Sequence, residues 1–254
     1  MKSSKVALAP FLRSCTAITT LGIRPNIDDY SAEEKGLLRS AERIFFPTPR
    51  FAYLFKALQI PTFPGYSTYQ FQHSRVLQQI LLAHLEIPHP VTRIYFGNRQ
   101  KAGIREAFPF PFLAMGPLAA LHKKQLVDNT TAFEECCRCY NPLILQRTAD
   151  WSECVRVLCV DADCVGALWR NGSPGSNVPY EPVPLEQPEL QAVLDSTLSF
   201  LRSVQLDDIV LEWGYGEGKW QLLEMTRPPV RWPMVKGILN RHDYICRLVQ
   251  SGRL

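Results

Sequence analysis

The sequence contains no uninterrupted apolar run of about 18 residues, so no helix that spans a bilayer is expected. Its N-terminal apolar segment is short and is interrupted by Pro10 and Arg13, which argues against a secretory signal. No block of lysines and arginines occurs, aromatic residues nowhere alternate with lysines, and the net charge is only +4 at pH 7. These absences predict a cytoplasmic protein that binds neither membranes nor nucleic acid. The mild positive charge still permits a phosphate-bearing ligand.

Spacings typical of disulfide scaffolds are also absent, although the chain has eight cysteines. The favoured interpretation is reduced, mostly buried thiols, as in cytosolic proteins. Cys136, Cys137 and Cys139 lie together in one helix-like segment. A metal site there is an open alternative, but no paired histidine and cysteine set accompanies these residues. The 254 residues show no internal repeat and suffice for one large or two small domains.

The first 71 residues show an alternating pattern of elements. Apolar runs typical of strands alternate there with amphipathic segments typical of helices, at residues 5–10, 28–42, 43–47, 51–58 and 60–63. Such alternation is typical of a small open sheet with helices packed on it. We therefore expect residues 1–71 to form an N-terminal α/β lobe.

Longer elements follow in the rest of the chain. A helix is predicted over residues 73–85, with Ser74 as its N-cap, and another over residues 185–204, where apolar residues recur at helical spacing. Residues 155–160 and 164–170 predict two strands joined by a polar turn. Strands and helices in these proportions predict an α/β (α+β) protein.

Two glutamates lie on a second predicted hairpin near the end of this region. Strands at residues 209–213 and 220–225 flank a turn over residues 216–218, and we expect Glu212 to face Leu222. In that register Glu212 and Glu224 share one face and lie roughly 8 Å apart. Carboxylates so placed can converge on a hard cation such as Mg²⁺. Two solvated carboxylates on an amphipathic hairpin are the alternative.

Five segments, taken in order, resemble the ATP-grasp superfamily, and the RimK-type ligases in particular. The resemblance covers residues 72–229. It implies an ATP-grasp fold in which the N-terminal lobe precedes a two-subdomain nucleotide-binding region with antiparallel sheets, at residues 72–254, where residues 91–145 are the smaller, lid-like part. The five segments are SRVLQQILLAHLEIPHPVT, FPFPFLAMG, PLILQR, VRVLCVDADCVGALWR and LEWGYGEGKWQLLEMTRPP.

The activity that this resemblance implies is ligation of a carboxylate to an amine through an acyl-phosphate, with ATP and Mg²⁺ or Mn²⁺. The substrates would be small-molecule or peptide carboxylates and amines, and a homodimer is left open. By position, Arg156 and Arg170 match the catalytic arginines that contact phosphate. The implied nucleotide contacts are Arg75, Met115, Gln146 and Arg147. The implied metal ligands are Glu212, Glu224 and Thr226.

Several positions depart from the family pattern. Met115 replaces a phosphate-binding lysine, and a thioether carries no charge. The glycine-rich loop that should follow reads GPLAALHKKQLV, which favours a packed or helical segment over an anion-binding loop. Lys123 and Lys124 are alternative sources of the missing charge. Arg147 replaces an acid and Thr226 an asparagine. These departures leave a second hypothesis open, a catalytically silent homologue that acts as a binding or regulatory partner.

Overall fold

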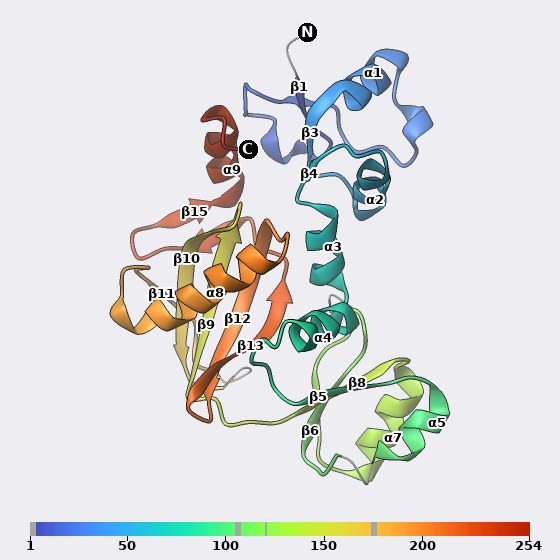
Figure 1. Ribbon diagram of the computed structural model, residues 1–254, viewed down its shortest axis with the longest axis vertical. Helices are drawn as coiled ribbons and strands as arrows, with labels where there is room; N and C mark the ends of the chain where they lie inside the picture. Colours follow the sequence, from blue (N-terminus) through green and yellow to red (C-terminus); the bar gives the residue numbers. More distant parts are fainter. Residues whose placement is uncertain (1–3, 105–107, 120, 174–176) are drawn as a thin grey trace.

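The computed structural model describes residues 4–104, 108–119, 121–173 and 177–254. Figure 1 shows the larger sheets arranged along the long axis of the molecule, with the N-terminal lobe at the top, the five-stranded sheet in the middle and a four-stranded sheet below. Parallel and antiparallel sheets occur together, so the predicted fold class is confirmed. Within the predicted domain ranges, residues 1–3, 105–107, 120 and 174–176 lie outside the described part of the chain.

A four-stranded parallel sheet in the order β2-β1-β3-β4 forms the N-terminal lobe. Helix α1 begins at a capping box between Ser31 and Glu34, and helix α2 begins after the N-cap Thr48. Strand β2 was not predicted, because two threonines carry no apolar pattern. The elements are β1 (Ser4–Ala7), β2 (Thr19–Thr20), α1 (Ala32–Ser40), β3 (Ala41–Phe45), α2 (Pro49–Ala57) and β4 (Thr62–Phe63).

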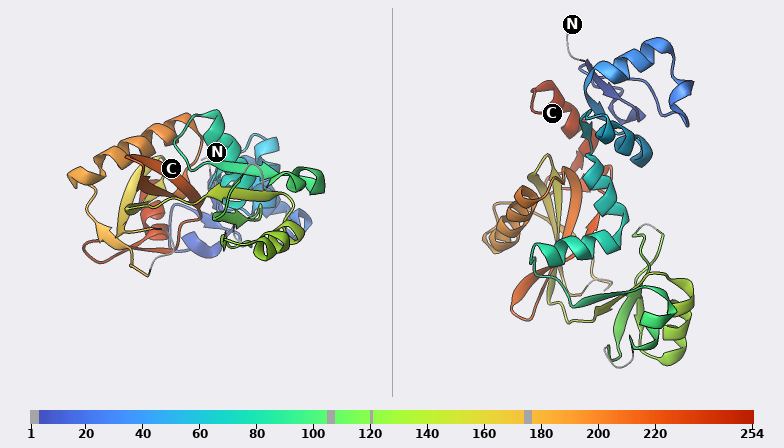
Figure 2. Two further views of the ribbon diagram at one scale, coloured as in Figure 1. Left: turned by 90° about the horizontal axis from the view of Figure 1, so that it is seen from below. Right: turned by 45° about the vertical axis from the view of Figure 1, so that its right-hand side comes forward.

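Two consecutive helices, α3 (Tyr66–His73) and α4 (Arg75–His84), connect this lobe to the rest of the chain. Ser74 separates them, and its side chain accepts a hydrogen bond from the Leu77 N–H at 3.2 Å, so the predicted cap is confirmed. Helix α3 was not predicted because its sequence is mostly polar. Figures 1 and 2 place α4 between the large sheet and the small sheet.

The smaller sheet is antiparallel, in the order β5-β8-β6-β7. Apolar side chains on one of its faces pack against helix α7, with Phe112 and Leu145 from the sheet and Phe133 from the helix. Its elements are β5 (Thr92–Tyr95), α5 (Gly97–Ala102), β6 (Phe112–Met115), β7 (Gln125–Val127), α7 (Thr130–Cys139) and β8 (Leu143–Arg147).

The large sheet is antiparallel, in the order β11-β10-β9-β12-β13. Its face toward α8 is entirely apolar along the central strands and includes Val157, Leu211 and Trp213. Helix α8 covers this face, as Figure 1 shows. The elements are β9 (Glu153–Val160), β10 (Asp163–Asn171), β11 (Glu181–Val183), α8 (Gln191–Ser203), β12 (Asp208–Gly216) and β13 (Lys219–Thr226).

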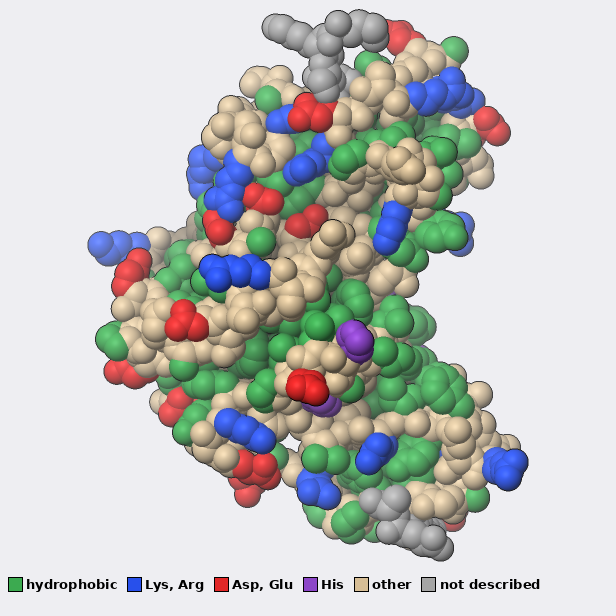
Figure 3. All heavy atoms as spheres, viewed as in Figure 1, with side chains coloured by type: hydrophobic (Ala, Val, Ile, Leu, Met, Phe, Trp, Pro, Cys, Tyr) green, Lys and Arg blue, Asp and Glu red, His purple; other side chains and the backbone are tan. Residues whose placement is uncertain are grey.

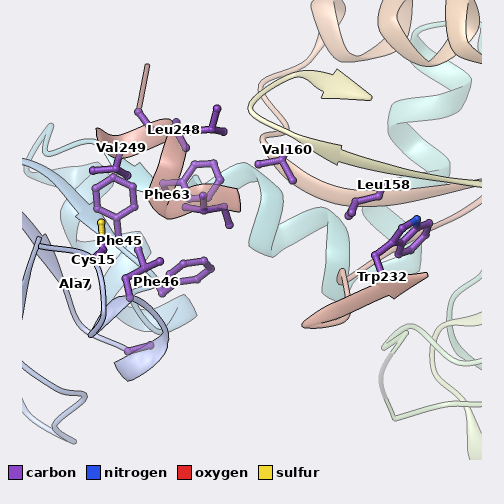
Figure 4. Close-up of a cluster of buried hydrophobic side chains, with 14 of the residues drawn as sticks. Ala7, Cys15, Phe45, Phe46, Phe63, Leu158, Val160, Trp232, Leu248 and Val249 are labelled. Carbon is purple, nitrogen blue, oxygen red and sulfur yellow. The ribbon is translucent and has the colours of Figure 1, made fainter. Parts of the chain in front are cut away.

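The C-terminal segment ties the large sheet to the N-terminal lobe. It contains β14 (Arg231–Pro233), β15 (Ile238–Asn240) and α9 (Arg241–Gln250). Figure 4 shows the shared apolar cluster, in which Leu158 and Val160 of the large sheet belong to the same core as Phe45 of the lobe and Leu248 of α9. No helix among the described residues has the length and apolar character needed to cross a membrane. Acidic and basic side chains are interspersed on the face in Figure 3.

The predicted register of the hairpin formed by β12 and β13 is wrong, because a β-bulge shifts the pairing by one residue. Glu212 faces Glu224 directly, whereas Trp213 faces Leu222, so Leu223 is an extra residue on β13. The bulge turns Leu222 to the α8 face, away from both glutamates. The turn has two central residues in place of the predicted three, Glu217 and Gly218, both with positive φ.

Candidate functional site

A row of charged residues crosses the face of the large sheet that α8 leaves uncovered. Arg156 on β9 lies opposite Glu212 on β12, and Glu212 lies opposite Glu224 on β13. Directly opposed residues point to the same face of a sheet. Arg170 on β10 shares that face, because it lies two residues beyond Leu168, the other neighbour of Arg156. The register brings four of the predicted site residues together.

Glu212 is held by side chains from its own sheet and the adjoining loop. Nη2 of Arg156 lies 3.3 Å from Glu212 Oε2, and the Tyr180 hydroxyl donates to Glu212 Oε1 at 2.5 Å. The Tyr180 ring lies between the guanidinium groups of Arg156 and Arg170, each 4.2 Å from the ring centroid. Arg170 also donates from Nη2 to the Tyr180 hydroxyl at 3.1 Å. One carboxylate, one phenol and two guanidinium groups thus form a connected cluster.

The protonation states in this cluster follow from burial and neighbouring charge. Burial, and then the Glu212 carboxylate, raise the pKa of Tyr180 above its ordinary value, so the phenol is a neutral donor. Burial and Glu212 likewise raise the pKa of the Cys154 thiol to about 11, which leaves no thiolate near neutral pH. Burial opposes the charge on Arg156, but Glu212 outweighs it and raises the Arg156 pKa. The Glu212 carboxylate therefore keeps the guanidinium group beside it charged.

Glu224 has different partners, which come from outside the sheet. Nε and Nη2 of Arg75, at the start of α4, each lie 3.3 Å from Glu224 Oε1. Nζ of Lys124, in the segment before β7, lies 3.1 Å from Glu224 Oε2. Burial of the Glu224 carboxyl opposes ionisation, yet Lys124 and Arg75 together hold its pKa below the ordinary value. Glu224 is therefore a carboxylate with a cation on each oxygen.

Arg75 also binds the backbone of the segment that carries Lys124. Its Nη1 donates to the carbonyl of His122 at 2.5 Å and approaches that of Gly116 at 3.3 Å, and its Nη2 approaches the carbonyl of Ala119 at 3.4 Å. Arg75 as a whole is 5% exposed. The N–H groups of the Arg75 guanidinium thus donate to protein oxygens. The resemblance to the ATP-grasp superfamily implies instead that a residue at this position contacts the nucleotide.

The segment after β6 is a closed turn. The N–H of His122 donates to the carbonyl of Leu118 at 3.0 Å. Gly116 is required here because a Cβ at that position would lie 2.4 Å from the His122 ring. The sequence predicted a packed or helical segment here. The packed alternative is wrong, because Leu118 and Leu121 are exposed, and the hydrogen bonds from Leu121 and His122 to the Leu118 carbonyl form a single turn. Ala120 lies outside the described residues.

The three predicted nucleotide contacts on the small sheet lie apart from the charged row. Met115 and Gln146 share the face of the small sheet away from α7 and are both buried. The Gln146 amide donates to the Thr92 hydroxyl at 3.2 Å. Arg147 is exposed, and its N–H binds the Val91 carbonyl at 2.9 Å. No hydrogen bond or ion pair within the described residues joins these three to either glutamate.

The two glutamates do not form an open pair of metal ligands. Thr226 follows Glu224 on the same face and is half-buried, but the oxygens of both carboxylates already contact cations or a hydroxyl. A divalent ion at Glu224 would lie beside the Lys124 ammonium and the Arg75 guanidinium, which both repel it. No cluster of three or more histidine, cysteine or acidic residues suited to a metal occurs among the described residues, and this includes the α7 cysteines. The arrangement does not fit the predicted Mg²⁺ or Mn²⁺ site.

Sequence reasoning missed Tyr180 altogether, since a tyrosine in a proline-containing loop carries no distinguishing pattern. A cavity of about 360 Å³ adjoins this part of the site and is lined by Arg170, Trp169, Asn171 and Glu181, among others. Nε of Arg170 is buried without a hydrogen-bond partner in the described structure.

The arrangement of the sheets matches solved structures. A RimK-domain ATP-grasp protein from Sphaerobacter thermophilus superposes with a TM-score of 0.64 over 89% of this chain and 91% of that one, at 12% identity. The chain has the ATP-grasp fold. The ATP-grasp ligase PsnB, complexed with a minimal precursor, matches over 99% of both chains at 12% identity, with a TM-score of 0.63.

A third structure with the ATP-grasp fold is the D-alanine–D-alanine ligase of Bacillus anthracis complexed with ATP, at 9% identity and a TM-score of 0.61, over 89% of this chain and 86% of that one. No protein-family model and no curated protein sequence matches the chain. The predicted resemblance is thus confirmed at the level of the fold.

Proposed function

We propose that the chain is an ATP-grasp-type ligase that joins a carboxylate to an amine through an acyl-phosphate. One observation carries the proposal: Arg156 and Arg170 lie on one face of the large sheet, clustered around Glu212 and Tyr180. Guanidinium groups stay charged and bind phosphate or carboxylate oxygens with paired N–H donors. Such groups stabilise the negative charge that develops when phosphate is transferred to a carboxylate.

The two arginines would have different tasks. The Arg156 side chain is 42% exposed, so it is the one that can contact a phosphate or acyl-phosphate oxygen. Arg170 is buried and is fixed by Tyr180, which in turn orients Glu212. Glu212 then holds Arg156 in place from the other side. In this proposal Arg156 binds the oxyanion, and the other three residues position it.

The nucleotide would lie between the large and small sheets, with its adenine edge at the backbone near Gln146 and Arg147 and an apolar contact from Met115. The ATP bound to the Bacillus anthracis ligase supports ATP as the nucleotide. The carboxylate substrate would be a small molecule or a peptide. We also propose the domain limits 1–71 and 72–254, with residues 91–145 as the lid-like part.

A second candidate is a catalytically silent ATP-grasp homologue that binds a ligand or a partner. Two observations favour it. Both carboxylate oxygens of Glu224 are paired with cations, Arg75 and Lys124, and the Met115 side chain is buried and uncharged. Both candidates include ligand binding at Arg156. They differ in whether phosphate transfer follows.

Incubation with ATP, pooled amino acids and dicarboxylates, and hydroxylamine as a general amine separates the two candidates. A ligase releases ADP and forms a hydroxamate only when a carboxylate is present, and Arg156→Met lowers that rate roughly 100-fold. Calorimetric binding of ATP without ADP release would favour the silent homologue. If saturating ATP produces no heat of binding and no thermal shift, the ligase proposal is contradicted.

A further inference from the structure

The two carboxylates of the charged row are neutralised by cations of different origin. Glu212 pairs with Arg156, a residue of the same sheet, whereas Glu224 pairs with Arg75 from α4 and Lys124 from the segment before β7. The side chain of Glu224 is only 15% exposed. Both of its oxygens contact cations within 3.3 Å. A further cation would have to displace one of these groups.

Arg75 fixes the position of Lys124. The Arg75 guanidinium binds Glu224 and, at the same time, the carbonyl of His122, two residues before Lys124. The backbone N–H of Arg75 donates to the Pro117 carbonyl at 2.9 Å, which anchors the start of the same segment. Lys124 therefore reaches Glu224 from a segment that is tied at two points. Its ammonium is a built feature of the site and not an exposed side chain that happens to lie nearby.

The charge of the row also argues against a divalent ion. Four cationic side chains, Arg75, Lys124, Arg156 and Arg170, surround two carboxylates, Glu212 and Glu224. The row is therefore net positive before any metal binds. Such a site attracts an oxyanion directly, and it repels a divalent cation.

We propose that the Lys124 ammonium occupies the cation position at Glu224, so that the site excludes Mg²⁺ and Mn²⁺ there and binds an oxyanion with the cations of the chain itself. The identity of the oxyanion, a nucleotide phosphate, rests on the proposed function. The exclusion of the metal does not. Lys124 has two further N–H donors besides the one directed at Glu224, and with its side chain 27% exposed it can share them with a phosphate oxygen.

Titration with Mn²⁺ alone, followed by electron paramagnetic resonance, tests the exclusion without nucleotide. We expect no saturable Mn²⁺ binding to the wild-type protein that depends on Glu224. Lys124→Met removes the charge and keeps much of the side-chain length. It should create saturable Mn²⁺ binding that is at least about tenfold tighter than any weak binding by the wild type. Adding Glu224→Gln to this variant should abolish the gain. Lys123→Met is the matched control, since Lys123 is exposed, and it should change nothing.

Either of two results would overturn the inference. One is saturable Mn²⁺ binding to the wild-type protein that Glu224→Gln removes. The other is a folded Lys124→Met variant, judged by circular dichroism and its thermal midpoint, that binds Mn²⁺ no better than the wild type. Failure of ATP to bind would contradict the ligase proposal and leave the Mn²⁺ result unaffected, so the two failures are distinguishable.

Discussion

Two carboxylates on strand β12 point to the same face of the large sheet, and each is paired with an arginine. Asp208 and Arg241 are almost fully buried, with side-chain exposures of 3% and 2%. Glu212 is also buried, but its partner Arg156 is 42% exposed. Both pairs join a carboxylate of β12 to an arginine from another element, and they differ in how far the arginine is exposed to solvent.

The difference in access separates a pair that holds the fold from a pair that can meet a ligand. Arg241 is the first residue of α9 and also donates from Nε to the Pro229 carbonyl at 3.1 Å, so the Asp208 pair fastens the C-terminal segment to the sheet. Within the described part of the chain, the contacts of the Arg156 guanidinium are with Glu212 of the same sheet and Tyr180 of the adjoining loop. An ion pair alone therefore does not identify a functional site. The exposure of its arginine distinguishes a pair that can bind a ligand from a pair that stabilises the fold.

The largest expected effect is on the buried pair. Arg241→Met would leave the Asp208 carboxylate buried without its cation and should lower the free energy of unfolding by about 3–5 kcal/mol. Urea denaturation measures the loss. Asp208→Asn combined with Arg241→Met is the control and should recover part of it. A loss below about 1 kcal/mol would show that the buried pair does not hold the fold.

Substitution in the exposed pair, Arg156 with Glu212, should affect ligand binding strongly and stability only weakly. Arg156→Met should change the free energy of unfolding by less than about 1 kcal/mol, because the arginine is partly solvated. ATP binding or ADP release should nevertheless fall by roughly 100-fold, because the cation for the oxyanion is lost. Calorimetry and an ADP assay measure this. Wild-type activity in the variant would remove Arg156 from the site.

His242 gives the buried junction a pH dependence. Burial, and then Arg241, lower the pKa of His242 to about 4, and Asp243 and Arg227 act on it more weakly. The unfolded histidine takes up a proton near its ordinary pKa of about 6.5, while the folded one does not, so stability falls as the pH drops from about 6.5 to 4. The loss amounts to about 3 kcal/mol.

His242→Phe, which can keep the stacking on Phe11, should reduce this dependence. Burial raises the pKa of Asp207 to about 6, which makes stability fall as the pH rises from about 4 to 6 and partly masks the histidine. The difference between wild type and variant, measured by urea unfolding at several pH values, isolates His242. An unchanged difference from pH 4 to 7 would contradict the assignment.

The smallest effect is expected at the hairpin turn that joins β12 to β13. Glu217 has a φ of 55°, a conformation that asparagine adopts more readily than glutamate. Glu217→Asn should raise the free energy of unfolding by about 0.5 kcal/mol and leave ATP binding unchanged. Thermal unfolding measures the change in stability, and calorimetry measures the affinity for ATP. A change in ATP affinity would mean that the charged row responds to the sheet as a whole.

Local patterns predicted much of this fold. Apolar residues at helical spacing and the N-cap Ser74 predicted helix α4. The alternation of strand-like and helix-like segments predicted an α/β arrangement at the N-terminus. The hairpin register was wrong because a bulge at Leu223 leaves no mark in the alternation of residue types. Helix α3 was missed because its buried polar residues bind the backbone and side chains of distant segments; Gln72, for example, contacts the Asp208 carbonyl.

The site was predictable to the extent that it follows from the sheet register. Arg156, Arg170, Glu212 and Glu224 share a face because strands pair that way. The partners of Glu224 were not predictable, because Arg75 and Lys124 arrive from a helix and a turn whose approach is set by tertiary packing. Tyr180 is a similar case, since the path of its loop decides that the ring lies between two arginines.

In the proposed function, the charged row binds a nucleotide with the cations of the chain itself. Calorimetric titration of the wild-type protein with ATP in the presence of EDTA, repeated with Mg²⁺, tests it most directly. We expect saturable binding in both conditions, with affinities that agree within about tenfold. Binding that requires Mg²⁺ and is lost in Glu224→Gln would contradict it.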